Sequence, residues 1–325
     1  MTATRSNRIV AWLLGGLVLV AVPAVGAAQD APAAPADGAG EDAPSLAKMW
    51  EDFVYFVRVA QGPAALSNAR ALASRAGNTE AEQALYLLAI GTKDVEAQDI
   101  LRQAGNLDKQ LAEPVATIRE MIERGYNALR RDPQRIAEAI AKLGQHERAA
   151  RIGMERLRVS GQYALPQLVQ ALRDADTSDL ARGRIATLLP EMGPEGIRPM
   201  AVALQSEDAQ LVEVLAGALA QTPYPHAAPR LREALARDDL PARTRQIVRR
   251  ALVACAGEQA PGLSVGEVFR RTGERYYYRR ESLRPPAAAD TANVWFWRNR
   301  RLEYTPVPRP IFCYVYAMRY ARLAV

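Results

Sequence analysis

The sequence is short of the residues from which most metal and redox sites are built. Its 325 residues include only two cysteines, Cys255 and Cys313, and two histidines, His146 and His226. Two cysteines without a Cys-x-x-Cys spacing exclude a disulfide framework and a cysteine-based zinc site. Two interpretations remain for them: a single disulfide in an oxidising compartment, or two buried apolar thiols, the usual role of free cysteine.

Motifs for catalysis or cofactor binding are also missing. His146 has no second histidine four residues later, which excludes a zinc-protease helix, and both histidines are expected in turns or caps. There is no Gly-x-Ser-x-Gly elbow, phosphate loop or dinucleotide glycine pattern. The acidic pairs Asp238-Asp239 and Glu41-Asp42 lie in an expected turn and linker. We therefore expect no catalytic, cofactor-binding or metal-binding residues, and we expect that the chain is not an enzyme. The alternative is an enzyme of an unrecognised type, whose site is assembled from distant parts of the chain and leaves no local motif.

Lysine is the scarce basic residue. Only Lys48, Lys93, Lys109 and Lys142 occur, and arginine supplies the rest of the 42 basic residues. Such a bias is typical of a codon-composition effect. The net charge of +6 therefore does not by itself indicate a nucleic-acid partner.

The N-terminus has the organisation of an export signal. Arg5 and Arg8 precede an uncharged apolar run, and the small residues 24–28 follow Pro23. We expect a signal peptide over 1–28, cleaved near Ala27 or Ala28, and a periplasmic or extracellular mature protein. An uncleaved anchor is the alternative, and only then would the chain contact a membrane. Residues 29–44 are rich in Ala, Pro and acids, which predicts a disordered linker.

From residue 45 onward, apolar residues recur with the period of an α-helix. Helical hairpins are expected over 45–160. Local signals mark several helix starts: a capping box of Thr79 and Glu82, an N-cap at Asp132 before Pro133, and a capping box of Ser264 and Glu267. No convincing alternating strand precedes residue 290.

Residues 161–263 contain a repeat. Three segments align, LPQLVQALRD from Leu165, IRPMAVALQS from Ile197 and APRLREALAR from Ala228, with shared leucines 32 and 31 residues apart. Each has a proline near its start, an acidic turn after it and a second amphipathic segment. A helix pair of this size cannot bury its apolar face alone, so neighbouring pairs are expected to stack.

At these residues the chain resembles the HEAT-repeat, armadillo-like family. It also resembles exported bacterial HEAT-repeat proteins of unassigned activity, in which a segment like that from Gly273 to Trp297 follows the repeats. The resemblance implies an all-α fold, a right-handed α-α superhelix of helix pairs with a short C-terminal capping segment. Members serve as scaffolds and adaptors. A few relatives are enzymes, so an unrecognised HEAT-related enzyme with a site assembled across repeats is the alternative.

The segment 264–325 differs in composition from the rest. It holds 12 of the 21 aromatic residues and twelve arginines against five acidic residues. A helix to about Tyr278, a short strand or extended arm at 293–297 and a helix from about Arg309 to Leu323 are expected. Either its aromatics dock it on the last helix pair, or it binds a ligand. The predicted interaction surface is Arg275, Tyr276, Tyr277, Tyr278, Arg279, Arg280, Trp295, Trp297 and Arg298.

Arginine beside aromatic rings suits planar anionic ligands. The leading hypothesis is an exported scaffold that binds an unknown protein partner of the cell envelope. A protein that binds envelope glycans or anionic polymers is the alternative. Nucleic acid is disfavoured because the chain is expected to be exported.

Overall fold

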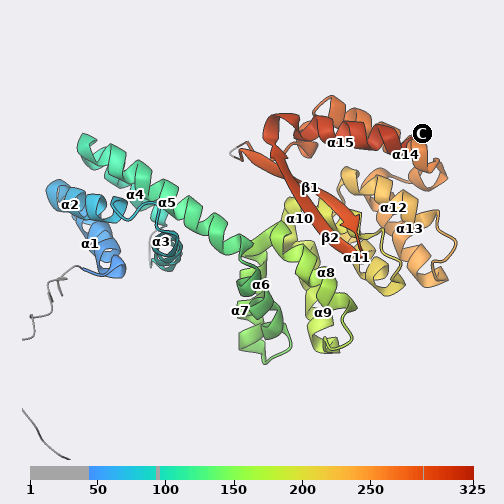
Figure 1. Cartoon of the computed structure of the whole chain (residues 1–325), viewed down its shortest axis with the longest axis horizontal. Helices are drawn as coiled ribbons and strands as arrows, with labels where there is room; N and C mark the ends of the chain where they lie inside the picture. Colours follow the sequence, from blue (N-terminus) through green and yellow to red (C-terminus); the bar gives the residue numbers. More distant parts are fainter. Residues whose placement is uncertain (1–43, 93–95, 288) are drawn as a thin grey trace, which may run out of the picture. The chain divides into compact units, whose positions relative to one another are not determined.

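The computed structural model describes residues 44–92, 96–287 and 289–325. These residues are mostly helical and include one two-stranded antiparallel sheet (Figure 1). The expected signal segment and all of the expected linker except Pro44 lie outside the described residues. No helix in the described part of the chain is long and apolar enough to cross a membrane.

The first five α-helices surround an apolar cluster of their own that includes Trp50, Phe53 and Ile118. Their bounds are α1 Leu46–Arg58, α2 Gly62–Ala73, α3 Thr79–Gly91, α4 Ala97–Leu107 and α5 Ala112–Arg131, with the 3₁₀ turn η1 at Lys109–Leu111 before α5. Helices α3 and α5 cross at Gly125, where a Cβ atom would lie 2.1 Å from the Glu82 carbonyl oxygen. The crossing therefore requires glycine.

The predicted capping box of Thr79 and Glu82 is wrong. The N-cap of α3 is Asn78, whose side chain accepts a hydrogen bond from the backbone N–H of Ala81. The Glu82 carboxylate instead accepts from Arg124 Nε at 2.9 Å and from the Gly77 N–H at 2.9 Å. Asn78 thus provides the local cap, and Glu82 adds an ion pair to α5.

Eight helices follow as consecutive pairs: α6 Pro133–Leu143, α7 Glu147–Ser160, α8 Leu165–Arg173, α9 Asp179–Leu188, α10 Gly193–Ala203, α11 Ala209–Gln221, α12 Ala228–Leu235 and α13 Ala242–Ala256. The three aligned segments coincide with α8, α10 and α12. A 3₁₀ turn precedes each of them, at η2 Gly161–Ala164, η3 Leu189–Met192 and η4 Pro225–Ala227. The predicted two helices per segment are confirmed. Pro199 lies inside α10 rather than near its start, because α10 begins at Gly193 with Pro194 in its first turn.

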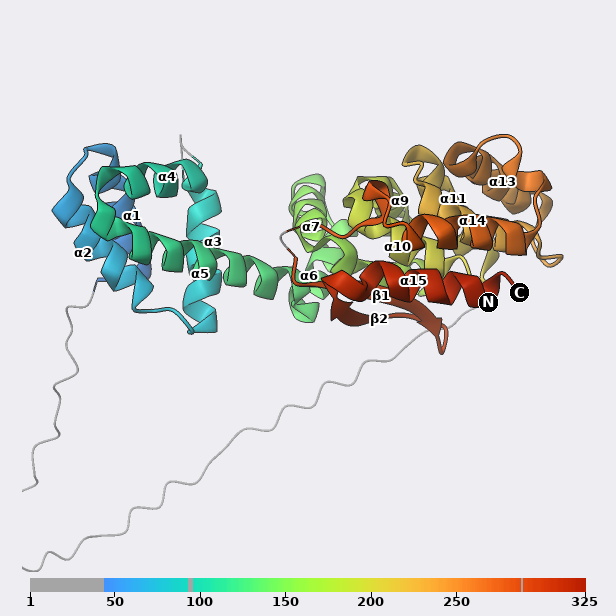
Figure 2. The same ribbon diagram turned by 90° about the horizontal axis from the view of Figure 1, so that it is seen from above.

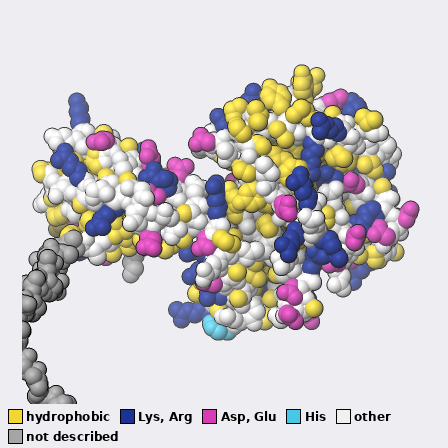
Figure 3. All heavy atoms as spheres, viewed as in Figure 1, with side chains coloured by type: hydrophobic (Ala, Val, Ile, Leu, Met, Phe, Trp, Pro, Cys, Tyr) yellow, Lys and Arg dark blue, Asp and Glu magenta, His cyan; other side chains and the backbone are white. Residues whose placement is uncertain are grey.

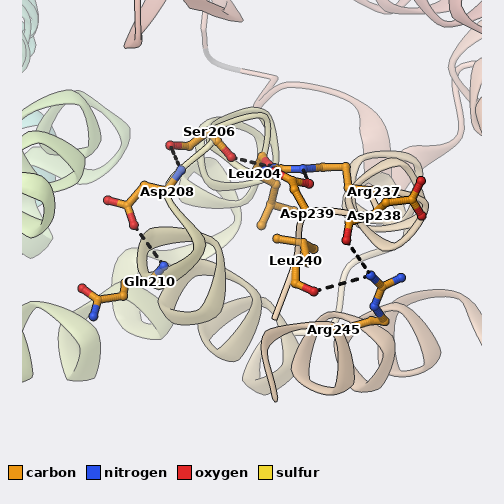
Figure 4. Close-up of polar contacts among 9 residues, drawn as sticks. All are labelled: Leu204, Ser206, Asp208, Gln210, Arg237, Asp238, Asp239, Leu240 and Arg245. Carbon is orange, nitrogen blue, oxygen red and sulfur yellow. Dashed lines mark hydrogen bonds and ion pairs between the residues drawn. The ribbon is translucent and has the colours of Figure 1, made fainter. Parts of the chain in front are cut away.

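The pair α10–α11 is joined to the pair α12–α13 through their turns (Figure 4). Arg237, after α12, donates to the Ser206 carbonyl at 2.6 Å, and Ser206 belongs to the turn after α10. The same guanidinium bonds both carboxylate oxygens of Asp239, and it lowers the pKa of that carboxyl. Asp208 caps α11. Asp208 thus caps a helix, and Asp239 orients the arginine that joins the two turns.

The C-terminal segment contains α14 Val265–Tyr277, the 3₁₀ turn η6 Glu281–Leu283, the strands β1 Thr291–Arg298 and β2 Arg301–Pro308, and α15 Arg309–Leu323. A further 3₁₀ turn, η5 Ala260–Gly262, precedes it. Both predicted helices are confirmed, and Ser264 caps α14 by accepting from the Glu267 N–H at 3.1 Å. The hairpin contacts α8 and α10 on one side and α15 on the other. Figures 1 and 2 show α15 alongside the hairpin.

Strand β1 is buried on both faces, which explains its unbroken apolar run. Trp295 and Trp297 pack against the helix pairs, whereas Val294 and Phe296 pack with the α14–α15 cluster. The sequence predicted this strand but not its partner β2. Asn299 and Arg300 form the two-residue turn with φ of 51° and 59°, a conformation for which Asn-Gly is the usual signal.

Candidate interaction surface at the C-terminal segment

Two glycines allow α14 and α15 to pack closely. A Cβ atom on Gly266 would lie 2.6 Å from the Ala324 carbonyl oxygen, and one on Gly273 would lie 3.3 Å from Tyr320 Cβ. The two glycines are seven residues apart and so occupy one face of α14. This close approach brings the aromatic side chains of both helices into a common cluster.

The cluster between α14 and α15 is built largely from aromatic rings. Tyr276 stacks on Tyr316 with ring centroids 4.9 Å apart, and Tyr320 meets both rings edge-on. Phe269 and Phe312 complete it. Burial raises the pKa of Tyr276 and Tyr316 and raises that of Tyr320 to about 12. These hydroxyls stay protonated at physiological pH and are part of the packing.

Arginines of the preceding helix pairs fasten this cluster in place. Arg198 of α10 donates from Nε to the Tyr276 hydroxyl at 3.1 Å and from Nη2 to the Leu283 carbonyl at 2.8 Å. Its guanidinium lies 4.9 Å from the centre of the Phe312 ring. Arg230 of α12 lies 5.2 Å from the Phe269 ring in the same way. Such cation–π contacts are strongest where water is excluded.

The C-terminal segment does more than cover the last helix pair. Helix α14 contacts α12, as a cap on that pair would, but the hairpin also contacts α8 and α10. The arginines over its rings include Arg198 and Arg230, which belong to the preceding helix pairs. The segment is thus bound along the first helix of each of three pairs, α8, α10 and α12.

The nine predicted surface residues fall into three groups. Tyr276 and Trp295 are fully buried and belong to the core. Trp297 is half-buried below the Arg173 guanidinium, and Arg298 is exposed over Phe296 at the hairpin tip. The third group, at the end of α14, is exposed: Arg275, Tyr277, Tyr278, Arg279 and Arg280.

An apolar face of α15 extends the exposed group, and the sequence analysis missed it. Ile311, Tyr314 and Met318 are exposed at helical spacing, and Tyr314 meets Tyr277 edge-on at 6.4 Å. With Tyr278, which is 70% exposed, these residues form what we call the aromatic surface: Tyr277, Tyr278, Ile311, Tyr314 and Met318. Hydrophobic side chains gather over α15 in Figure 3. The available signal was the apolar run from Ile311 to Met318, which is too long to be confined to one face of a helix.

A basic groove lies beside the aromatic surface. It has a volume of about 600 Å³, and its lining includes Arg271, Arg275, Tyr278 and Arg280. Glu267 neutralises Arg270 and Arg271, and these two arginines, Arg270 first, lower its pKa to about 2. Within the described residues no ion pair involves Arg275, Arg279 or Arg280. Uncompensated positive charge therefore borders an apolar face.

The scarce cysteines and histidines are accounted for by local structure. Cys255 and Cys313 are buried free thiols, in agreement with the second of the two interpretations. His146 caps α7 by accepting from the Ala149 N–H at 3.3 Å. His226 lies in the turn η4 but is buried, and burial lowers its pKa well below the ordinary value, with Arg198 adding to the shift.

In the described part of the chain, no group of three or more Cys, His, Asp or Glu residues is arranged to hold a metal ion. No family model, no curated protein and no solved structure matches the chain.

Proposed function

We propose that the chain is an exported, non-catalytic helical-repeat scaffold that binds an acidic protein segment at the aromatic surface. Consecutive helix pairs with a recurring order of elements support a HEAT-like solenoid. The observation that carries the binding proposal is the unpartnered apolar face of α14 and α15, which arginines border. Rigid tyrosines and arginines are the side chains that most often dominate protein interfaces.

The charge beside the aromatic surface selects the class of partner. Arg275, Arg279 and Arg280 are exposed within six residues of sequence and lack carboxylate partners in the described structure. An acidic segment with apolar side chains would place its carboxylates on these arginines and its apolar side chains over Tyr314 and Met318. A purely apolar partner would leave the arginines unpaired, which opposes its binding.

An anionic envelope polymer is the second candidate. The groove of about 600 Å³ beside the surface favours it, because its arginine lining could follow a repeating anionic chain. A polymer of this kind makes little use of Ile311 and Met318. Substitutions on α15 therefore separate the two candidates.

The test uses point variants because deleting residues 264–325 would remove Trp295 and Leu302 from the core they share with the helix pairs. The first variant combines Tyr278→Ser, Tyr314→Ser and Met318→Ser. Its matched control combines Ile152→Ser and Leu180→Ser, two exposed apolar residues on α7 and α9. Circular dichroism and thermal unfolding establish that both variants fold.

In-cell crosslinking of tagged copies followed by mass spectrometry then identifies partners. The protein proposal predicts a defined protein that the wild type and the control capture and the surface variant loses. A second variant, Arg275→Ser with Arg279→Ser and Arg280→Ser, should weaken the same capture. Retention on a polygalacturonate column tests the polymer candidate. If the arginine variant changes this retention, the surface variant does not, and protein capture is unaffected, the polymer candidate replaces the protein scaffold.

A further inference from the structure

A groove lies between helix α8 and the turn that joins β1 to β2. Its volume is about 470 Å³, and small-molecule sites commonly measure about 300–1,000 Å³. The polar part of its lining includes Gln170 and Arg173 of α8 and Asn299, Arg300 and Arg301 of the hairpin. None of these residues belongs to the aromatic surface or to the basic groove beside it. This is therefore a separate candidate site.

The charged residues of this lining are all positive. It contains three arginines and no acidic residue. Arg300 and Arg301 are exposed, and neither forms an ion pair within the described residues. Arg173 has a distant carboxylate partner, Asp208, whose Oδ2 lies 4.0 Å from its Nε and which does not line the groove. Charge of one sign in a cleft raises the local concentration of the opposite ion, so the groove favours an anionic ligand.

Arg173 holds the turn in a fixed position beside α8. Its Nη1 donates to the Arg300 carbonyl at 2.7 Å, and its guanidinium carbon lies 5.9 Å from the centre of the Trp297 ring. The Arg173 side chain is still 21% exposed, so part of it remains open to a ligand. Leu302, just after the turn, is buried in the core of the helix pairs. Both walls of the groove are thus fixed before a ligand arrives, and little entropy is lost on binding.

The turn itself carries two local costs. Arg298 and Arg301 lie directly opposite each other in the register of the hairpin, and like charges in that position destabilise a strand pair. Arg300 has a φ of 59°, a conformation that glycine adopts far more readily. Local costs of this kind concentrate at functional sites. An anion bound at Arg301 would reduce the repulsion between the opposed arginines.

Two amides in the lining suit hydroxyl groups. The side chains of Gln170 and Asn299 are exposed, and no hydrogen bond of either is found in the described part of the chain. An amide both donates and accepts, as a sugar hydroxyl does, whereas arginine matches a carboxylate or phosphate. The apolar lining residues Val169 and Leu302 are only 2% and 5% exposed, so the groove offers little surface to an apolar ligand.

We propose that this groove binds an anionic sugar. Its carboxylate or phosphate group lies against Arg173, Arg300 and Arg301, and its hydroxyls bond Gln170 and Asn299. The site does not depend on the proposed scaffold function, because it shares no residue with the aromatic surface.

The test is isothermal titration calorimetry of the full chain at one ionic strength set by sodium chloride. The ligands are digalacturonate, which carries carboxylates, glucose 6-phosphate, which carries a phosphate, and the uncharged disaccharide cellobiose. We expect a measurable Kd for at least one of the two anionic sugars and none for cellobiose. The tighter of the two ligands identifies the anionic group.

Arg300→Gly combined with Arg301→Gln should raise the Kd about fivefold or more, because an exposed charge pair changes an affinity by up to about fivefold. The charge-matched control is Arg148→Gln combined with Arg151→Gln. These two arginines of α7 are exposed and form no ion pair within the described residues. The control should bind the sugar as the wild type does.

The single variant Arg300→Gly separates binding from folding. Glycine adopts a φ of 59° without strain, and Asn-Gly is the favoured two-residue turn. This variant should therefore melt at or above the wild-type Tm while it binds the sugar more weakly. A merely structural role of Arg300 would not produce that combination.

Four results would overturn the proposal. The first is no heat of binding from either anionic sugar, and the second is a cellobiose Kd equal to that of digalacturonate. The third is an equal loss of affinity in the groove variant and its charge-matched control, which would show a non-specific charge effect. The fourth is loss of binding in the variant of Arg275, Arg279 and Arg280, which would place the sugar in the groove beside the aromatic surface.

Discussion

Replacing Trp295 by alanine should detach the hairpin from the helix pairs. The side chain is fully buried, and its indole donates to Gln162. Removing about 200 Å² of buried surface at about 25 cal/mol/Å² costs about 5 kcal/mol, and the lost hydrogen bond costs about 1 kcal/mol. Tryptophan-to-alanine changes in cores cost about 3–5 kcal/mol. We therefore expect Trp295→Ala to lower the free energy of unfolding by about 4–5 kcal/mol.

Trp297→Ala is the matched control, because Trp297 lies on the same face of β1 but is half-buried. It should cost about 2 kcal/mol by the same area argument. The assay is urea unfolding followed by far-ultraviolet circular dichroism, with limited proteolysis in buffer to detect release of residues 291–308. Equal losses for the two variants would refute the conclusion that Trp295 anchors the hairpin.

Two further predictions concern packing and pH. Gly266→Ala should destabilise the chain by about 2 kcal/mol or more in urea unfolding, because the added methyl group meets the Ala324 carbonyl oxygen at 2.6 Å. The control Gly105→Ala lies in α4 with open space around it and should stabilise the chain by up to about 1 kcal/mol. Equal effects of the two substitutions would contradict the close packing of α14 and α15. His226 has a lowered pKa in the folded chain, so below about pH 6.5 the unfolded chain binds a proton that the folded chain does not. As the pH falls below about 6.5, His226 should lower the free energy of unfolding by at most about 1.4 kcal/mol per pH unit. His226→Leu should remove this contribution to the pH dependence of stability, whereas His146→Gln should not. A pH profile that His226→Leu leaves unchanged would show that another group is responsible.

Most of the helices could be predicted because their signals are local. Asp132 before Pro133, Ser264 with Glu267, and the repeated Ala-Leu pairs each specify a helix start or face within a few residues. The capping box at Thr79 failed because the helix begins one residue earlier than predicted, with the neighbouring Asn78 as its N-cap. Strand β2 was missed because its turn uses Asn-Arg and its sequence contains two prolines, which suit an edge strand but weaken the local signal.

The candidate surface was only partly predictable. Composition located the aromatic and basic segment, but Tyr276 and Trp295 lie inside it, and Ile311, Tyr314 and Met318 were not selected. Tyrosine, tryptophan and arginine occur both in cores and at interfaces, so residue type does not decide which role each one has. Both faces of α15 carry large apolar side chains, so residue type did not show which face packs against α14.

The sequence by itself determined that the described chain is mostly helical, where its repeat lies, and that its aromatic and basic residues concentrate at one end. These properties depend on spacing and on neighbours a few residues apart. Only the tertiary structure decided that Arg198 and Arg230 contact the C-terminal rings, and that Arg173 and Arg300 meet at one groove. Residues from α8 and the hairpin become neighbours only when the hairpin packs on the helix pairs, and no local pattern records that event.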